Sequence, residues 1–416
     1  MTRTALLSVC TMALAATLSA PAPGLAQARN TLDIYVPDTE GGGATLLVTP
    51  TGESVLIDTG FPGDRDHDRI MEVIKAAGLS RIDHLISTHY HVDHVGGVQQ
   101  LAEALPIGHY IDHGPSVEER EQVQGFQAAY AELYGAATHT VVAPGDTLEI
   151  AGLEWTILAS AGNTIGSPLP GAGQDNAAAC SASEVKPLPE RDPENAMSVG
   201  SLIRFGEFST VHLGDLYWAK ELELMCPVNR VGTVDLYLVS HHGSDQSGSP
   251  ALVHGLQPRV AVMQNGTRKG GAAEVMRTIL TSPGMEDLWA LHWSYNAKID
   301  LNPPGLFIAN VDEDTAIADV LTAPPPAPRG GGGPQGGRMG QAPGAGRQGA
   351  GGAVTPGPGR AGAPGGAQAG RGGRGGRGAG PAGHTPAHYI KISASEDGSF
   401  SVTNSRNGVT KSYAAH

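Results

Sequence analysis

The sequence predicts an α/β fold in four layers, with two β-sheets inside and helices on both outer faces. Three observations predict it. Short apolar runs of strand type alternate with segments of helical spacing, and this alternation fills two successive halves of the chain. No apolar run after residue 30 approaches the roughly 18 residues that cross a bilayer. Three cysteines in 416 residues exclude a disulfide-dense scaffold and a zinc module with four cysteine ligands.

Strands and helices alternate in the first half of the chain. Apolar residues recur every three or four positions in the segments expected to be helical, which are residues 68–77, 98–105 and 117–134. Runs rich in Val, Ile, Leu and Thr between turn residues predict the strands. These cover residues 31–36, 44–48, 54–58, 84–87, 140–142, 147–150 and 153–158.

A Gly-, Pro- and Asn-rich loop at residues 161–196 leads into the second half. A hairpin turning at Gly206 and Glu207 is expected first, and a last hairpin is expected around Glu396-Asp397-Gly398. The expected strands of this half cover residues 198–205, 210–213, 235–239, 259–263, 306–308, 389–393 and 400–403.

The first 28 residues have the composition of a secretory signal peptide. Arg3 gives a basic start, residues 5–18 are apolar and small, and Ala26-Gln27-Ala28 has the form after which signal peptidase cuts. We therefore expect a periplasmic or secreted protein that keeps no transmembrane anchor after cleavage. In an oxidising compartment Cys180 and Cys226 are the expected disulfide pair, and two isolated thiols are the alternative.

A Gly- and Pro-rich segment interrupts the chain before its last strands. Residues 324–386 contain seven Arg, no acidic residue and no aromatic residue, so they cannot bury enough apolar surface to offset the entropy of ordering. Four segments are therefore predicted. They are a signal peptide at residues 1–28, the α/β domain at 29–322, a disordered segment at 323–387 and a C-terminal β-hairpin at 388–416 that packs on the domain.

The residues that can carry chemistry are concentrated directly after the strand expected at residues 84–87. His89, His91, Asp93 and His94 lie within six residues there, and two glycines follow, which we expect to allow a tight turn. Imidazole and carboxylate groups suit Zn²⁺ and, with more oxygen ligands, Mn²⁺ or Fe. The pattern therefore predicts a metal site.

His89-x-His91-x-Asp93-His94 resembles the HxHxDH motif of the metallo-β-lactamase superfamily, whose fold is a four-layer αββα sandwich. Leu56-Ile57-Asp58-Thr59-Gly60 is similar to the strand-end Asp-x-Gly of that family, and Leu213-Gly214-Asp215 resembles its bridging-aspartate motif. Ser240-His241-His242-Gly243-Ser244 resembles the HHGS ending of the ComEC-type branch. That branch includes the hydrolase domain of DNA-uptake proteins and phosphorylcholine esterases.

The resemblance implies a site for one or two divalent ions, with zinc in first place and manganese as the alternative. Asp93 and His242 would be catalytic, His242 as a substrate-facing or second-shell imidazole. Asp58 is expected to orient ligands by hydrogen bonds. The implied ligands are His89 and His91 for the first ion, Asp93, His94 and His241 for the second, and Asp215 as the bridge, with His242 as the alternative to His241 because His241 is favoured only by lying closer to the strand end.

One expected ligand is missing from the sequence. Superfamily members place a Gly-His after the strand that enters the long loop, whereas this chain has Asn163 there. No histidine occurs between His139 and His212. The open position of the first site is therefore expected to be filled by Asn163, Asn195, His113 or water.

A metal-bound hydroxide is the expected nucleophile, which makes hydrolysis the expected reaction. The HHGS resemblance favours a phosphodiester or a related ester, and a lactone or a β-lactam-like amide is the alternative. The chain carries a net charge of −14, which becomes −22 without Arg3 and the seven arginines of the insert. Such a surface repels long nucleic acids, so a small-molecule or ester substrate is favoured over nucleic acid.

An alternative of another class is a non-catalytic exported binding protein that uses the Arg-Gly repeats at residues 371–377. No aromatic residue interleaves these arginines, so a solvated spacer is favoured. Asn265, Arg268 and Lys269 follow an expected strand and could lie at the mouth of a pocket or in a solvated loop. His292 is expected inside a strand, with a pocket-lining position as the alternative.

Overall fold

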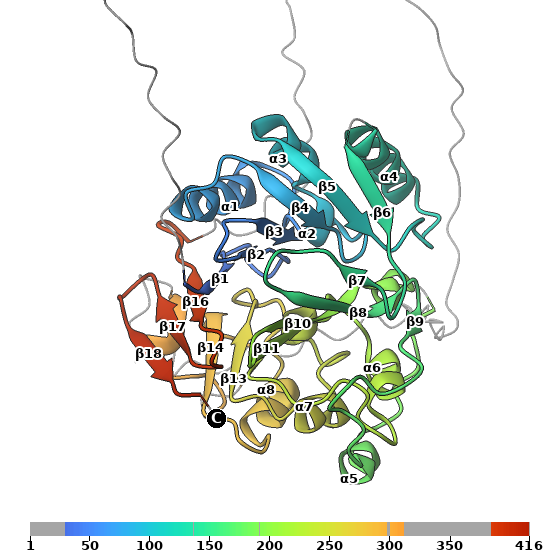
Figure 1. Ribbon diagram of the computed structural model, residues 1–416, viewed down its shortest axis with the longest axis vertical. Helices are drawn as coiled ribbons and strands as arrows, with labels where there is room; N and C mark the ends of the chain where they lie inside the picture. Colours follow the sequence, from blue (N-terminus) through green and yellow to red (C-terminus); the bar gives the residue numbers. More distant parts are fainter. Residues whose placement is uncertain (1–29, 136, 191, 298–299, 312–383, 416) are drawn as a thin grey trace, which may run out of the picture.

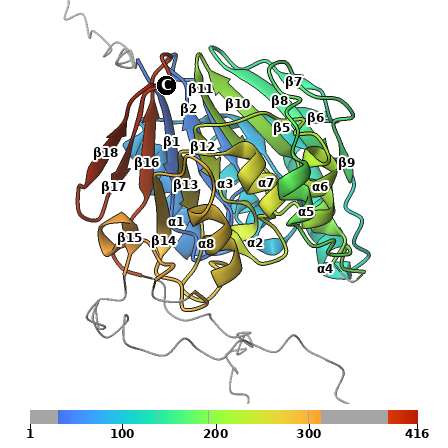
Figure 2. The same cartoon turned by 90° about the horizontal axis from the view of Figure 1, so that it is seen from below.

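The computed structural model describes residues 30–135, 137–190, 192–297, 300–311 and 384–415. Within these residues the strands form two nine-stranded sheets that pack face to face, with helices over the outer face of each (Figure 1, Figure 2). The predicted four-layer αββα fold is confirmed. The signal peptide predicted at residues 1–28 and most of the disordered segment predicted at 323–387 lie outside the described residues.

The first sheet is built from both ends of the chain. Its C-terminal strands continue it beyond β1, because β16 pairs antiparallel with β1. The expected final hairpin is therefore part of a three-stranded extension of this sheet. Across the sheet the order is β18 (Thr410–Tyr413), β17 (Phe400–Asn404), β16 (Ile390–Ala394), β1 (Leu32–Val36), β2 (Thr45–Val48), β3 (Ser54–Ile57), β4 (Ile82–Ile86), β5 (Ile107–Asp112) and β6 (Thr138–Val141).

The second sheet comes from the middle of the chain. The hairpin expected at Gly206 is formed by its β10 and β11. Across the sheet the order is β15 (Ile308–Asn310), β14 (Asp287–His292), β13 (Val260–Met263), β12 (Leu236–Leu238), β11 (Phe208–His212), β10 (Gly200–Phe205), β8 (Glu154–Ser160) and β7 (Thr147–Leu148), with β9 (Asn163–Thr164) paired to β8.

Helices cover both outer faces. The first sheet carries α1 (Asp64–Ala76), α3 (Val98–Ala104) and α4 (Glu121–Tyr134), and α2 (Val92–Val95) is a single turn inside the HxHxDH motif. The second sheet carries α6 (Trp218–Met225), α7 (Pro250–Leu256) and α8 (Ala273–Leu280), while α5 (Ala177–Ser181) packs on α7. The short 3-10 turns are η1 (Glu194–Met197), η2 (Ser240–Gly243) and η3 (Gly305–Phe307).

Three apolar cores explain the four layers. Successive side chains of a strand face opposite sides of its sheet, and β1 shows this directly. Ile34 lies in the core between the two sheets, together with Ile203 and Trp289 of the second sheet. Its neighbour Tyr35 lies in the core under the helices of the first sheet. A third core joins the second sheet to α6, α7 and α8. No helix within the described residues is long and apolar enough to cross a membrane.

Cys180 in α5 and Cys226 at the end of α6 are joined by a disulfide, with their Cα atoms 5.8 Å apart. The bond closes a loop with a sequence separation of 46 residues. We expect the purified protein to lack two thiol protons in non-reducing mass spectrometry. Reduction should lower the melting temperature, because the loop-entropy relation gives a bridge of this span a stabilisation of about 4 kcal/mol. The double variant Cys180→Ser/Cys226→Ser should melt like the reduced protein, and two free thiols in the native protein would contradict the prediction.

Candidate metal centre

The candidate metal centre lies where the ends of four strands meet. Asp58 follows β3, and the HxHxDH motif follows β4, which is parallel to β3. Asp215 follows β11, and the two histidines of η2 follow β12, which is parallel to β11. Parallel strands bring the loops at their carboxyl ends to one edge of a sheet. Because the two sheets face each other, the two edges form one site.

Four possible donor atoms for a metal ion lie close together at this edge. They are Asp93 Oδ2, His94 Nε2, Asp215 Oδ2 and His242 Nε2. His94 Nε2 lies 3.2 Å from His242 Nε2, 3.3 Å from Asp215 Oδ2 and 3.6 Å from Asp93 Oδ2. His242 Nε2 lies 3.4 Å from each of the two carboxylate oxygens. Five of the six distances between these atoms are therefore 3.2 to 3.6 Å, and all four atoms lie within 4.8 Å of one another.

The dimensions of this group fit a divalent ion. A regular tetrahedron with edges of about 3.4 Å has its corners about 2.1 Å from its centre, which is the usual distance from zinc to imidazole nitrogen or carboxylate oxygen. Two imidazoles and two carboxylates are also a donor set that zinc and manganese accept. We call this group the second site, because it contains Asp93 and His94, which the resemblance implied as ligands of the second ion.

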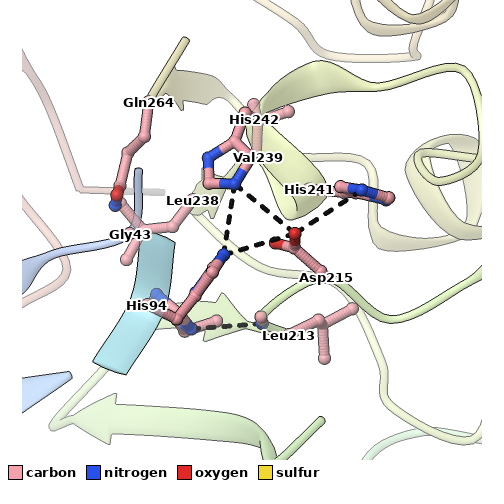
Figure 3. A pocket seen from close by; sticks show the side chains of 11 residues that line it. Gly43, His94, Leu213, Asp215, Leu238, Val239, His241, His242 and Gln264 are labelled. Atoms are coloured by element: carbon pink, nitrogen blue, oxygen red, sulfur yellow. Dashed lines mark hydrogen bonds and ion pairs between the residues drawn. The ribbon is translucent and has the colours of Figure 1, made fainter. Parts of the chain in front are cut away.

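His242 and His241 lie on different sides of Asp215. Figure 3 shows His94 and His242 on one side of the Asp215 carboxylate and His241 on the other. His241 Nε2 lies 3.5 Å from Asp215 Oδ2. From the sequence, His241 is the favoured ligand of the second site and His242 the alternative. The structure groups His242 with Asp93, His94 and Asp215, so we interpret His242 as the ligand of the second site.

The backbone of η2 is the reason for this arrangement. His241 and His242 both have left-handed backbone angles, with φ values of 52° and 55°. Such a conformation costs about 1–2 kcal/mol for each residue that has a Cβ atom. Backbone hydrogen bonds hold it: His241 N donates to Gly214 O, and Gly271 N donates to His242 O. Two neighbouring imidazoles can therefore approach Asp215 from two directions.

The first site contains the other half of the motif. His89 Nε2 and His91 Nδ1 are 3.1 Å apart, and His89 Nε2 lies 4.0 Å from Asp215 Oδ2. On its far side, His91 Nε2 faces Asp192 Oδ1 at 2.9 Å and Glu118 Oε1 at 3.3 Å. Asp215 is thus the carboxylate next to both halves, as expected for a bridging ligand.

His241 is connected to the first site through hydrogen bonds. Asn195 Nδ2 lies 3.4 Å from His241 Nε2 and donates to the Tyr217 hydroxyl. That hydroxyl donates to the backbone oxygen of Asp192, whose side chain faces His91. Asn195 Oδ1 is buried and has no hydrogen-bond partner among the described residues. Asn195 and Tyr217 therefore connect His241 to Asp192, the residue that faces His91.

One ring nitrogen lies beside a protein oxygen in four of these histidines, which are His89, His91, His94 and His241. His94 Nδ1 lies 2.7 Å from Asp58 Oδ2, and His89 Nδ1 lies 3.0 Å from the Thr88 hydroxyl. Thr88 also donates its hydroxyl and its backbone N–H to Asp58. His241 Nδ1 lies 3.0 Å from the Ser247 hydroxyl. This arrangement leaves the other nitrogen of each ring for an ion, and Asp58 orients ligands as expected.

The electrostatics of the centre favour a cation. Burial alone would raise the pKa of Asp215, but the imidazoles of His94 and His241 bring it well below its usual range. Burial alone would lower the pKa of His94, but the carboxylates of Asp215 and Asp58 raise it well above its usual range. Burial lowers the pKa of His241 to about 4, which keeps this ring neutral. A proton on His94 thus balances part of the carboxylate charge, and a bound metal ion would take the place of that proton.

The comparison with known families agrees with this geometry. Residues 38–189 match the model of the Metallo-beta-lactamase superfamily. The chain has the metallo-β-lactamase fold. The matched residues include Asp58 and the whole HxHxDH motif.

Relatives of this metallo-β-lactamase-fold protein share limited parts of it. ComE operon protein 3 of Bacillus subtilis (strain 168) is 26% identical over 226 residues, which are 51% of this chain and 25% of that protein. Hydroxyacylglutathione hydrolase of Edwardsiella ictaluri (strain 93-146) is 29% identical over 121 residues, which are 29% of this chain and 39% of the relative. The chain thus spans well under half the length of these curated relatives. Among solved structures, YhfI, a metallo-beta-lactamase fold protein from Bacillus subtilis, is 15% identical to this chain, with a TM-score of 0.38. The match covers 62% of this chain and 96% of the YhfI chain.

Several other candidates from the sequence have different roles in this metallo-β-lactamase fold. Asn163 is exposed in β9 and donates to Ala161 O. His113 is buried, and its Nε2 lies 2.9 Å from Glu194 Oε1. Neither belongs to the donor groups described above. Asn265 is buried and donates to His292 O, so it supports the backbone.

The two glycines after the motif serve close packing. Gly96 and Gly97 have ordinary helical angles, with φ values of −62° and −89°. A Cβ atom on Gly97 would lie 2.3 Å from Thr59 O, and one on Gly96 would lie 2.4 Å from the Pro62 ring. The tight turn expected here therefore needs these glycines for their small size, because they let α2 approach the loop after β3, which carries Asp58.

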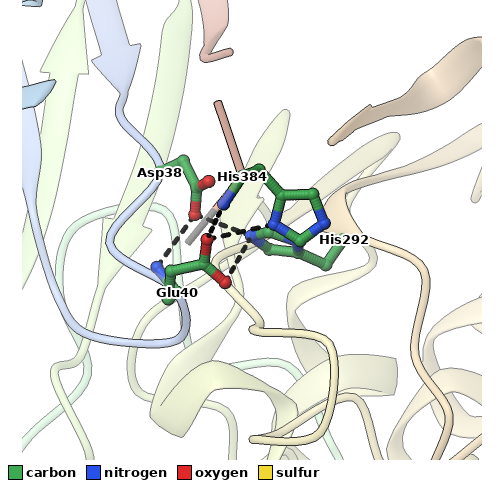
Figure 4. Close-up of side chains that lie close together, drawn as sticks. All are labelled: Asp38, Glu40, His292 and His384. Atoms are coloured by element: carbon green, nitrogen blue, oxygen red, sulfur yellow. Dashed lines mark hydrogen bonds and ion pairs between the residues drawn. The ribbon is translucent and has the colours of Figure 1, made fainter. Parts of the chain in front are cut away.

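A second cluster of ionisable side chains joins distant parts of the chain (Figure 4). His292 Nε2 lies 2.6 Å from Asp38 Oδ1, and His384 Nδ1 lies 3.0 Å from Glu40 Oε1. Arg69 from α1 pairs with Asp38 at 2.9 Å and with Glu40 at 3.2 Å. Because the guanidinium already supplies the positive charge, we interpret this cluster as an ion-pair network that anchors the residues before β16.

Proposed function

We propose that this protein is an exported hydrolase that binds two divalent ions, zinc in first place, and cleaves a phosphodiester or a related ester. The observation that carries the proposal is the shared carboxylate of Asp215. Its Oδ2 atom is one of the four donor atoms of the second site, and it also lies beside the His89–His91 pair of the first site. Two such positions on either side of one carboxylate suit chemistry that needs two neighbouring cations.

The protein's own groups would divide the work as follows. Asp93 and Asp215 supply the negative charge that holds the cations, and Asp58 keeps His94 in the orientation that presents Nε2. Asp192 faces His91 Nε2 and so keeps His91 in the orientation that presents Nδ1. When bound, the ions would lower the pKa of a water molecule and polarise the phosphoryl or carbonyl oxygen under attack. Asp93 is the described carboxylate placed to orient that water, because it lies at the outer, less buried edge of the second site.

Two lines of support favour a phosphodiester. The HHGS segment resembles the ComEC-type branch, and the similarity to ComE operon protein 3 extends over half of this chain. The pocket at the centre is lined by polar side chains, including His94, His212 and Gln264. The charge of −22 that remains without Arg3 and the insert arginines favours a small substrate over a long polyanion.

Export is supported by two features of the chain. Ala26-Gln27-Ala28 has the form of a signal peptidase site. The disulfide between Cys180 and Cys226 is a bond that persists mainly in oxidising compartments.

The proposal predicts metal-dependent hydrolysis. A chelator should abolish turnover of bis(p-nitrophenyl) phosphate, and Zn²⁺ or Mn²⁺ should restore it, because the proposed reaction needs an ion to activate the water and polarise the substrate. The same preparation should be assayed on a lactone and a β-lactam. His89→Ala should remove turnover, while His254→Ala in α7 serves as the matched control and should keep it.

Each outcome of this experiment bears on one part of the proposal. Full activity in protein shown to be metal-free would end the metal hypothesis. Faster turnover of the lactone or the β-lactam would replace the phosphodiester by that substrate class. Failure to hydrolyse any substrate, together with ligand binding that requires residues 371–377, would favour the non-catalytic binding protein.

A further inference from the structure

We propose that Lys269 is the substrate-binding cation of this site and that the substrate carries a negatively charged oxygen on its reacting group. The inference rests on the proposed hydrolase function and narrows its substrate class to anionic esters such as phosphodiesters. It is carried by the position of one side chain at the outer edge of the second site.

Lys269 lies in the loop between β13 and α8, and its ammonium reaches the metal ligands. Nζ pairs with Asp93 Oδ2 and lies 2.6 Å from Gly41 O. Asp93 Oδ2 is the same atom that lies 3.4 Å from His242 Nε2. The positive charge of Lys269 therefore lies beside the four donor atoms of the second site.

The backbone around Lys269 is fixed, whereas its side chain is accessible. A Cβ atom on Gly270 would lie 1.9 Å from His242 O, so the loop passes directly over η2. Gly266 N donates to Lys269 O, which closes the turn. The Lys269 side chain is 41% exposed. Its four-carbon stem can therefore move the ammonium between Asp93 and a ligand that enters from solvent.

Binding of the ions would weaken the attraction between the Lys269 ammonium and Asp93. Without ions, Lys269 neutralises part of the charge of Asp93. With divalent cations on Asp93 and Asp215, that carboxylate is neutralised from the other side, and the ammonium loses most of its attraction to it. A non-bridging phosphate oxygen at the centre would replace the lost partner. A neutral ester offers no such charge.

Arg268 provides a matched control. It precedes Lys269 in the same loop and carries the same charge, but its guanidinium lies over the Tyr295 ring, 4.7 Å from the ring centroid. A general effect of loop charge would therefore appear in Arg268→Gln as strongly as in Lys269→Met. A specific anion-binding role would appear only in the Lys269 variants.

The experiment measures the binding of inorganic phosphate to zinc-loaded protein by titration calorimetry, beside zinc content and turnover. Lys269→Met should weaken phosphate binding by about ten- to a hundredfold, the value of a charge-assisted hydrogen bond. It should raise the KM for bis(p-nitrophenyl) phosphate by a similar factor. The KM for a neutral p-nitrophenyl ester should stay the same. Lys269→Arg should retain part of the phosphate affinity, and Arg268→Gln all of it.

The outcomes separate this inference from the proposed function. Phosphate affinity in Lys269→Met equal to that of the parent protein would overturn the inference even if the hydrolase is active. Equal losses on the anionic and the neutral ester would also overturn it. If Lys269→Met only binds zinc more tightly, the ammonium is a competitor of the second ion and the inference is wrong. If Lys269 controls phosphate binding but the parent protein hydrolyses no ester, the inference stands and the proposed function fails.

Discussion

Replacing Asp215 by asparagine is expected to remove both ions and to slow hydrolysis by about a thousandfold or more, because two cations supply several kcal/mol of transition-state stabilisation. The asparagine side chain has nearly the same shape but no charge, so it cannot offset two divalent ions. Asp215 Oδ2 is the atom around which the centre is arranged. It lies 3.3 Å from His94 Nε2, 3.4 Å from His242 Nε2, 3.5 Å from His241 Nε2 and 4.0 Å from His89 Nε2.

The measurement is the number of ions per chain, by elemental analysis, beside turnover and circular dichroism. Asp146→Asn is the control, because Asp146 lies in an exposed turn where its carboxylate accepts a hydrogen bond from Ala143 N. That variant should keep both the ions and the activity. A folded Asp215→Asn protein that retains two ions per chain would show that this carboxylate is not the bridge.

Much of the fold could be predicted because its strands are regular in sequence. The strand of residues 31–36 was expected because apolar residues dominate it, and β1 occupies nearly the same residues. β5 escaped prediction because Gly108 and His109 interrupt its apolar pattern. Helix α1 begins at Asp64, before the expected start at residue 68, because its first turn is acidic and polar. Acidic residues favour a helix N-terminus, but they leave no apolar period to detect.

In the site, too, residues that are close together in the sequence could be predicted more easily than residues from separate segments. His89, His91, Asp93 and His94 are contiguous, so a motif could reveal them. Asp215 and the HHGS segment also have recognisable motifs, but the residues that orient the first site have none. Glu118, Asp192 and Tyr217 orient the first site, yet they belong to three separate segments. Only the packing of those segments brings them to the metal ligands.

The assignment of the two neighbouring histidines depends on backbone angles that no sequence pattern reports. In an extended strand end, the residue nearer the strand would face the ions, which made His241 the expected ligand of the second site. Left-handed angles at both residues turn His242 toward Asp93 and His94 instead. Such a conformation needs Gly214 and Gly271 as hydrogen-bond partners from distant segments.

His241 and His242 are therefore expected to hold different ions. Each single variant, His241→Ala or His242→Ala, should bind one ion per chain instead of two. Each should slow turnover by about a hundredfold or more, because the reaction then proceeds with one cation. His254→Ala in α7 controls for the loss of a histidine as such, and it should keep two ions.

Single variants do not reveal which ion is lost, so the decisive comparison combines each of them with Asp93→Ala. Asp93 belongs to the second site, where its Oδ2 lies 3.4 Å from His242 Nε2. His242→Ala/Asp93→Ala should damage one site twice and still retain one ion on His89 and His91. His241→Ala/Asp93→Ala should damage both sites and retain none. Metal content of the two double variants checks this directly. The opposite result would return His241 to the second site, and equal metal content in both would mean that the two histidines do not divide the ions between them.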